Sequence, residues 1–230
     1  MLSSIGFIPD GNRRFAKERG VSIIEAYSIG TEKAWKTIEW LKEYPSIKSG
    51  VFYTLSLKNL SRKKQEVSLL FEIFENELKK VTESSFFEKN SIRLKFIGRL
   101  NELPEKIRQK ITEAENATAS FSKKTIYLAL GYDGQAEIVD AARQLALDYC
   151  EGKINLKELD EQSFKQYLYL SKEPELIIRT SGEQRLSGFL PYQSTYSELY
   201  FCKKYWPEFE KRDLARALKD YSKRKKNFGK

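Results

Sequence analysis

Short apolar runs alternate with long amphipathic segments, and this alternation restricts the fold of the chain more than any other feature. The continuous apolar runs suit strands that are buried on both faces. They are Leu2–Ile8, Gly50–Leu57, Ile92–Ile97, Thr125–Leu130 and Leu176–Arg179, and a short sixth strand could lie at Leu199–Phe201. Helical spacing marks Ile23–Tyr44, Lys63–Thr82, Pro104–Ala119 and Gln135–Cys150. The alternation predicts an α/β fold with a mainly parallel central sheet flanked by helices.

The length of the chain, 230 residues, suits one α/β domain with a substantial core. No internal repeat, low-complexity tract or linker interrupts it, and Gly152–Lys153, the best candidate for a break, has the character of a turn after a helix. We therefore predict a single domain over residues 1–230. No stretch approaches the roughly 18 apolar residues of a membrane-spanning helix, and no signal peptide is visible at the N-terminus.

The chain contains no histidine, and this excludes several kinds of catalytic site. It rules out a Ser-His-Asp or Cys-His nucleophile, an imidazole general base and any zinc site that uses histidine. The two cysteines, Cys150 and Cys202, are too few for a four-cysteine zinc site. A reduced, cytoplasmic setting is a simpler interpretation of them than a disulfide framework.

The net charge of +9 is concentrated at the C-terminal end. Residues 211–230 hold nine Lys or Arg against two acids, which gives +7. A basic end is typical of proteins that bind nucleic acid, an anionic membrane surface or a phosphate ligand. The solvated face of a last helix explains it equally well, so the charge alone does not select a partner.

Ligands of open parallel sheets bind beyond the carboxyl ends of the strands, so we expect a ligand site among the residues that follow each predicted strand. After the first strand, Asp10 and Gly11 precede what appears in the sequence as a helix start, followed by Asn12, Arg13 and Arg14. Free N–H groups at a helix start bind phosphate, and a carboxylate beside them suits a magnesium ion on a diphosphate. The alternative is an Asp N-cap with solvent-facing arginines.

Two later strands end in similar polar segments. Ser56-Leu57-Lys58-Asn59-Leu60-Ser61-Arg62 follows the second strand, and Arg179-Thr180-Ser181-Gly182-Glu183-Gln184-Arg185-Leu186-Ser187-Gly188 follows the fifth. Arginine suits a bidentate grip on phosphate. An apolar loop and a single acid, Glu198, come next, and we expect this acid to share the edge of the sheet with Asp10. The segments together imply a ligand with a phosphate head and an apolar tail.

Three segments resemble the cis-prenyltransferases, the undecaprenyl (polyprenyl) diphosphate synthase family. They are IPDGNRRFAKERG, YTLSLKNLSR and RTSGEQRLSGFLPYQSTYSELYF, and the last is highly specific. The resemblance extends from about Gly6 to Gly229, and the motif IPDGNRR is similar to that of archaeal members. It implies a homodimer that adds isopentenyl diphosphate to an allylic diphosphate of farnesyl or geranylgeranyl type, with Mg²⁺, and makes each new double bond cis. The product would be a polyprenyl diphosphate.

The resemblance also implies roles for individual residues. Asp10 would bind Mg²⁺ and assist departure of the allylic diphosphate, with Asn59 assisting proton loss. Glu198 would be a second metal carboxylate that reaches the site across the dimer. The residues implied in substrate binding are Gly11, Asn12, Arg13, Arg14, Phe15, Tyr27, Ser56, Lys58, Arg62, Arg179, Arg185 and Ser187, of which the last three match the isopentenyl diphosphate site. The chemistry needs charge stabilisation but no strong base, so a chain without histidine can perform it.

The chain departs from the family pattern mainly on the allylic side. Ile23 and Tyr27 stand where members usually carry an arginine and a histidine that contact the allylic diphosphate. In the S-x-E-N-W pattern, Lys58 replaces the acid and Leu60 replaces the tryptophan. NYGGR becomes the segment 131–135, and the closing RRFGG becomes the segment 226–230. We expect an unusual allylic primer or product from these changes.

Other functions remain open at this stage. A short-chain or branched-product prenyl synthase on the same fold is one, and a non-catalytic partner subunit of a heteromeric enzyme is another. The retained carboxylates and arginines argue against the partner subunit. A nucleic-acid binder is disfavoured because the basic tail carries few interleaved aromatics. An amphiphilic product would bring the protein into transient contact with a membrane surface, to which the basic tail could contribute.

Overall fold

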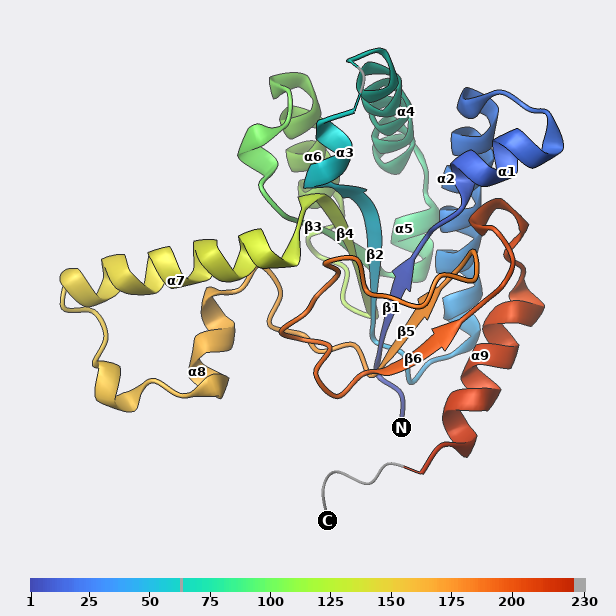
Figure 1. The fold of residues 1–230 in the computed structure, drawn as a ribbon. Helices are drawn as coiled ribbons and strands as arrows, with labels where there is room; N and C mark the ends of the chain where they lie inside the picture. The colour runs from blue at the N-terminus through green and yellow to red at the C-terminus, as the bar shows by residue number, and fades with distance from the viewer. Residues whose placement is uncertain (63, 226–230) are drawn as a thin grey trace.

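The strands form one six-stranded parallel sheet within the described residues, which are 1–62 and 64–225 of this computed structural model. Their order across the sheet is β3-β4-β2-β1-β5-β6, and every neighbouring pair is parallel (Figure 1). The strands are β1 (Ser4–Ile8), β2 (Ser49–Ser56), β3 (Ile92–Ile97), β4 (Lys124–Tyr132), β5 (Leu176–Arg179) and β6 (Glu198–Phe201). The predicted parallel α/β fold is confirmed, and the short sixth strand exists.

Helices occupy most of the segments between the strands, whereas an extended loop joins β5 to β6. The longer ones are α1 (Asn12–Arg19), α2 (Ile23–Trp40), α4 (Lys64–Glu83), α6 (Glu105–Thr118), α7 (Gly134–Cys150) and α9 (Lys211–Lys223), and the short ones are α3 (Leu57–Leu60), α5 (Phe86–Asn90) and α8 (Glu161–Phe164). The four helices predicted from apolar spacing are present. The first of them ends earlier than predicted, because residues 41–43 tighten into a 3₁₀ turn. The predicted start of α4, Lys63, lies outside the described residues.

The two faces of the sheet are covered differently. On one face the larger apolar core includes Phe7 and Phe52, whose rings stack 4.6 Å apart, together with residues of α2, α4, α6 and α9. On the other face a smaller cluster packs Val51 and Ile177 against Phe189 and Leu190, which belong to an extended loop. The apolar loop noted in the sequence is therefore the cover of one face of the sheet. Among the described residues, no helix is long and apolar enough to cross a membrane.

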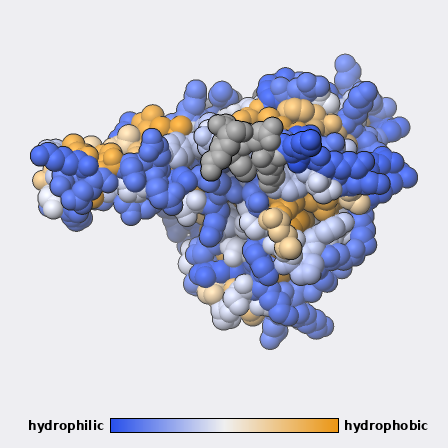
Figure 2. All heavy atoms as spheres, turned by 90° about the horizontal axis from the view of Figure 1, so that it is seen from below, coloured by the Kyte–Doolittle hydropathy of each residue, from blue (hydrophilic) through white to orange (hydrophobic). Residues whose placement is uncertain are grey.

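Helix α7 leaves the body of the molecule and, with α8, forms a projecting arm (Figure 1). Arg99, which follows β3, grips Asp140 of α7 through two hydrogen bonds of 2.8 and 3.0 Å, and Tyr169 donates to the same carboxylate. Figure 2 shows apolar side chains along this arm, and the exposed ones are Val139, Leu147, Tyr149, Leu156 and Leu159. The arm is thus anchored at its base by charge and leaves apolar surface open.

The strand order brings the predicted polar segments together. Strand β1 lies between β2 and β5, so Asp10, which follows β1, lies at the carboxyl edge of the sheet with Ser56 and Arg179, the last residues of β2 and β5. Glu198 does not join them in the same chain. It is the first residue of β6 and pairs with Leu176, the first residue of β5, so it lies at the amino edge. The expectation that both carboxylates share one edge is wrong, because the acid precedes its strand and does not follow it.

Candidate active site

A cavity of about 1100 Å³ opens at the carboxyl edge of the sheet. One end is lined by charged and polar side chains from the turn after β1, from the segment after β2, and from β5 and its loop. The other walls are apolar and include Leu70, Ile73 and Phe74 of α4, with Ala34 of α2. The cavity can therefore take a ligand with a charged head and a long apolar tail, as the sequence implied.

Helix α1 starts at this cavity without a side-chain cap. Its N-cap, Gly11, has a φ of +108°, and a Cβ there would lie 2.6 Å from the ring of Tyr205. Glycine is therefore required both by the backbone conformation and by the close packing. The Asp10 side chain does not cap the helix, so the alternative of a plain Asp N-cap is not what the structure shows. The uncapped N–H groups favour an anion at this helix start.

Asp10 lies between two arginines. Its Oδ2 accepts from Arg179 at 2.7 Å and its Oδ1 accepts from Arg14 at 3.2 Å. The hydroxyl of Thr180 accepts from the Asp10 N–H at 2.8 Å and donates to the Asp10 carbonyl at 2.7 Å. The turn that carries the carboxylate is therefore fixed from both sides by the residue that follows Arg179.

Arg179 is almost fully buried, and its side chain is only 4% exposed. It donates to Ser187 Oγ at 2.7 Å and to the carbonyl oxygen of Arg185. This places the predicted isopentenyl diphosphate residues in one cluster around a single guanidinium. Ser187 and Arg179 line the cavity, whereas the side chain of Arg185 is 60% exposed and reaches the cluster through Glu183.

The segment after β2 folds back on itself. Ser56 Oγ accepts from the Asn59 N–H, and the Asn59 side-chain oxygen accepts from the Ser56 N–H, both at 3.2 Å. This reciprocal cap fixes the short helix α3. Both residues and Lys58 line the cavity, so the capped turn holds the Asn59 amide at the polar end. The geometry is therefore compatible both with an ordinary capped polar turn and with a role in substrate binding.

Tyr27, Arg62 and Glu66 form a hydrogen-bonded cluster at the same end. Arg62 donates to the Tyr27 hydroxyl and to Glu66 Oε1, and Tyr27 donates to that oxygen, all at 2.9 Å. Burial raises the pKa of Tyr27, against the opposing charge of Arg62, so the phenol stays protonated. Burial also acts to raise the pKa of Glu66, but hydrogen bonding from Tyr27 and the charge of Arg62 outweigh it and lower this pKa overall. The cluster ties the segment after β2 to α2.

Most of the predicted site residues line this one cavity. They are Asp10, Gly11, Asn12, Arg13, Arg14, Tyr27, Ser56, Lys58, Asn59, Arg62, Arg179 and Ser187. Phe15 and Arg185 do not line it, and Glu198 lies at the other edge of the sheet. Glu66 and Glu183 were not predicted, because nothing in the sequence distinguishes them from other surface acids. Only their contacts with arginines in the structure single them out.

The comparison with known families matches residues 8–229 to the model described as "Putative undecaprenyl diphosphate synthase". The chain belongs to the undecaprenyl diphosphate synthase family, the cis-prenyltransferases. It is thus a transferase of prenyl groups, and the predicted family is confirmed. The replaced residues of segment 226–230 lie outside the described part of the chain.

Individual cis-prenyltransferases resemble this chain over nearly its full length. A "Tritrans,polycis-undecaprenyl-diphosphate synthase (geranylgeranyl-diphosphate specific)" of Methanopyrus kandleri is 42% identical over 227 residues, covering 98% of this chain and 83% of its own length. The crystal structure of a lavandulyl diphosphate synthase of Lavandula x intermedia, with dimethylallyl diphosphate, has a TM-score of 0.94 at 33% identity, covering 100% and 98% of the two chains. A probable undecaprenyl diphosphate synthase of Campylobacter jejuni has a TM-score of 0.83 at 32% identity, covering 100% and 99%.

Proposed function

We propose that residues 1–230 form one catalytic domain that condenses isopentenyl diphosphate with an allylic diphosphate primer and extends it to a polyprenyl diphosphate with cis double bonds. The observation that supports this most strongly is the cluster of Asp10, Arg14 and Arg179 at the head of an otherwise apolar cavity of about 1100 Å³. The product would serve as a precursor of a glycosyl-carrier lipid.

The geometry suits the ionisation of an allylic diphosphate. Departure of the diphosphate leaves a carbocation and places negative charge on the leaving group. Arg14 and the uncapped N–H groups of α1 stabilise that charge where it develops. The double bond of isopentenyl diphosphate, held through Arg179 and Ser187, attacks the cation, and a proton is then lost from the carbon next to the new cation. In this proposal Asn59 assists that loss, for which a weak acceptor is enough.

A divalent cation fits the donor set at Asp10. Among the described residues no group of three or more acids or cysteines could hold a metal by itself. Mg²⁺ commonly binds through one or two carboxylates together with substrate phosphate oxygens, and the Asp10 carboxylate faces the cavity. We therefore infer that Asp10 would hold Mg²⁺ with the allylic diphosphate. When bound, the ion would neutralise charge on the departing group.

We infer a primer of geranylgeranyl type, because the Methanopyrus kandleri relative and several others carry that specificity in their names. The test is to incubate the protein with Mg²⁺, labelled isopentenyl diphosphate and a panel of allylic diphosphates that runs from dimethylallyl to geranylgeranyl diphosphate. The products are then sized by chromatography, with Asp10→Ala as the control. A ladder of long products from the geranylgeranyl primer, absent in the variant, is expected. Incorporation with none of the primers would contradict the proposal.

A second candidate is a short or branched prenyl diphosphate product. The similarity to lavandulyl diphosphate synthase, which was crystallised with dimethylallyl diphosphate, favours it. The same panel separates the two functions, because a single short product from dimethylallyl diphosphate alone would replace the ladder.

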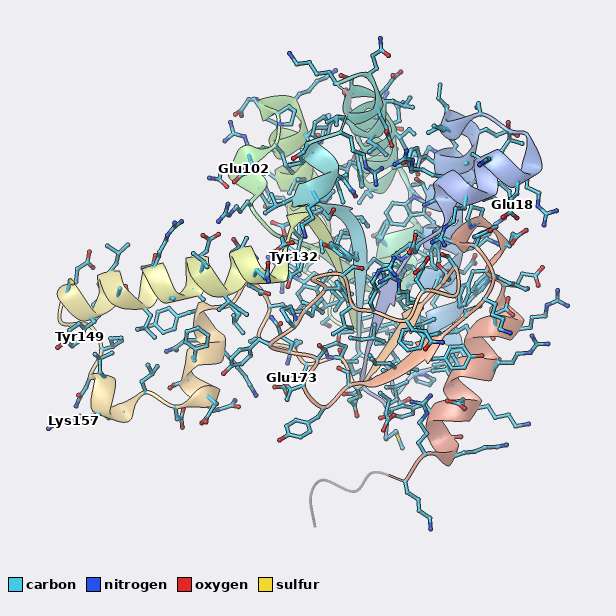
Figure 3. All side chains as sticks on the ribbon, in the orientation of Figure 1. Glu18, Glu102, Tyr132, Tyr149, Lys157 and Glu173 are labelled. Atoms are coloured by element: carbon cyan, nitrogen blue, oxygen red, sulfur yellow. The ribbon has the colours of Figure 1, made fainter. Side chains whose placement is uncertain are left out.

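We also propose that the protein is a homodimer in which the arm contacts the second copy. The exposed apolar side chains of the arm include Leu147 and Leu156, each about half exposed, and Tyr149 at the far end of α7 (Figure 3). Apolar surface of this kind marks an interface more often than a free surface. In the dimer Glu198 of one copy would complete the metal site of the other, which accounts for its distance from Asp10 in a single chain.

Contact with membranes would be transient in this proposal. A polyprenyl product is amphiphilic and must leave for a lipid phase, so we infer a cytoplasmic enzyme that works at the membrane surface. The described part of the basic C-terminal end forms α9, which buries Leu214, Ala217 and Tyr221 and exposes its lysines. This supports the interpretation of that charge as the polar face of a last helix, which can still attract anionic lipid.

A further inference from the structure

Five side chains of alternating charge run in series from the head of the cavity toward the surface. In order they are Arg179, Asp10, Arg14, Glu183 and Arg185, each in contact with the next. The first three belong to the reaction proposed above, and Arg185 matches the isopentenyl diphosphate site of the family. Glu183 has no role in that reaction, yet it joins Arg14 to Arg185.

The Glu183 carboxylate is built as a bridge. Its Oε1 accepts from Arg14 Nη1 at 2.7 Å and its Oε2 accepts from Arg185 Nη1. The preceding residues, Ser181 and Gly182, both have positive φ values of 76° and 73°, and the Ser181 N–H donates to the Lys204 carbonyl at 2.6 Å. The turn that aims the carboxylate between the two arginines is therefore held in place. Hydrogen bonds from Arg14 and Arg185 lower the pKa of Glu183, so it is an anion at neutral pH.

Glu183 must compete with both substrates for the same guanidinium groups. Arg14 would hold the allylic diphosphate and Arg185 the isopentenyl diphosphate, and a guanidinium binds phosphate in the same way as it binds a carboxylate. A diphosphate that takes Nη1 of either arginine therefore displaces one oxygen of Glu183. Once one arginine has been taken, the carboxylate keeps a single, partly exposed ion pair, and such pairs contribute little.

We propose that Glu183 couples the two diphosphate sites, so that binding of either substrate breaks the bridge and strengthens binding of the other. This inference rests on the proposed function, since it requires that both sites bind diphosphates. The first ligand bears the cost of breaking the bridge, and the second has only a single, partly exposed ion pair left to displace. By thermodynamic linkage the effect is the same in both directions.

Coupling is measured by binding alone, without turnover. The probe is the unreactive thiolo analogue of geranylgeranyl diphosphate, titrated by calorimetry with Mg²⁺ in every sample, with and without saturating isopentenyl diphosphate. In the wild type we expect isopentenyl diphosphate to tighten binding of the analogue by about fivefold. In Glu183→Gln, which lacks the charge, we expect the ratio of the two Kd values to fall to about 1. The reverse titration should give the same factors.

Two further variants make the test specific. Glu183→Asp keeps the charge but is one methylene too short to span both arginines, so its ratio should also fall toward 1. Glu208→Gln is the matched control, because Glu208 is equally buried and pairs with Arg19, outside this series of charges. Its ratio should equal that of the wild type.

The outcomes separate the inference from the proposed function. A wild type that binds both ligands, with the same ratio in Glu183→Gln, would overturn the coupling and leave the function intact. Binding of neither ligand by a folded wild type would overturn both, since there would be no pair of diphosphate sites to couple. A ratio that falls in both Glu183 variants but not in Glu208→Gln would support the inference.

Discussion

At the scale of single residues, Gly30 shows how closely the site is packed. A Cβ at this position of α2 would lie 2.4 Å from Asn12 Oδ1 and 3.3 Å from Trp206 Cδ1. Only glycine lets α2 approach the start of α1 in this way. Gly30→Ala should displace Asn12 and the helix start that receives the allylic diphosphate. We expect the KM for the allylic substrate to rise by about tenfold or more, with the KM for isopentenyl diphosphate nearly unchanged.

The stability of this variant should fall moderately. The clash costs about 1–3 kcal/mol of unfolding free energy, and the better helix propensity of alanine offsets up to about 1 kcal/mol of it. Ser28→Ala, on the exposed part of the same helix, is the control and should alter neither KM nor the melting temperature appreciably. Steady-state kinetics with each substrate varied in turn measures the effect. An unchanged allylic KM in a folded Gly30→Ala protein would show that Asn12 is not held by this contact.

At the scale of elements, the ion pair between Arg99 and Asp140 helps to hold the arm at its base. The bidentate hydrogen bonds from Arg99, followed by those from Tyr169, lower the pKa of Asp140. The carboxylate is only a quarter exposed, so Asp140→Asn should cost about 1–3 kcal/mol of unfolding free energy at pH 7. Because the folded pKa is depressed, this stabilisation is fully present above the unfolded value of about 3.9 and is lost as the pH falls through the lower, folded value.

Urea unfolding at pH 7 and at pH 3 measures this difference. The gap between wild type and Asp140→Asn should be large at pH 7 and smaller at pH 3, where Asp140 of the wild type begins to protonate. Asp148→Asn is the control on the same helix, because Gln144 donates to its side-chain oxygen at 2.9 Å, a bond that asparagine can also accept, and its ion pair to Lys153 is longer, at 3.8 Å. A difference in unfolding free energy between wild type and Asp140→Asn that is larger at pH 3 than at pH 7 would contradict the stabilising role of this ion pair.

The same scale shows which parts of the fold the sequence could predict. The strands and long helices follow from the sequence pattern. A strand buried on both faces is a continuous apolar run, and a helix buried on one face has apolar residues at spacings of three and four. Helices α5 and α8 have five and four residues, too few to display a period. The error at Glu198 has a different cause, since the acid stands directly before the predicted strand Leu199–Phe201 and the amino end of a parallel strand lies at the edge opposite Asp10. Most residues at the polar end of the cavity were predicted. The α4 residues of its apolar wall were not, because their spacing is that of any helix that packs on a core.

At the scale of the whole molecule, the proposed dimer would complete the site of one chain with Glu198 of the other. Asp10 lies at the carboxyl edge of the sheet and Glu198 at the amino edge, where Arg224 donates to it at 2.6 Å. The helix predicted at Gln135–Cys150 exists. Its apolar spacing could not show that it projects as an arm, because the same spacing is expected whether its apolar side chains pack against the sheet or against a second copy. A second copy placed on the arm would explain both features together.

Subunit mixing tests this arrangement directly. Asp10→Ala and Glu198→Ala should each abolish most of the activity as pure proteins. After unfolding and refolding of an equal mixture, half of the dimers contain one chain of each kind. If Glu198 acts across the dimer, each mixed dimer has one site with both carboxylates intact, so we expect about a quarter of the wild-type activity to return. If Glu198 acted within its own chain, every site would lack one carboxylate and no activity would return. Light scattering on each pure variant shows that both remain dimeric, so a mixture of intact dimers without recovered activity would rule out the shared site.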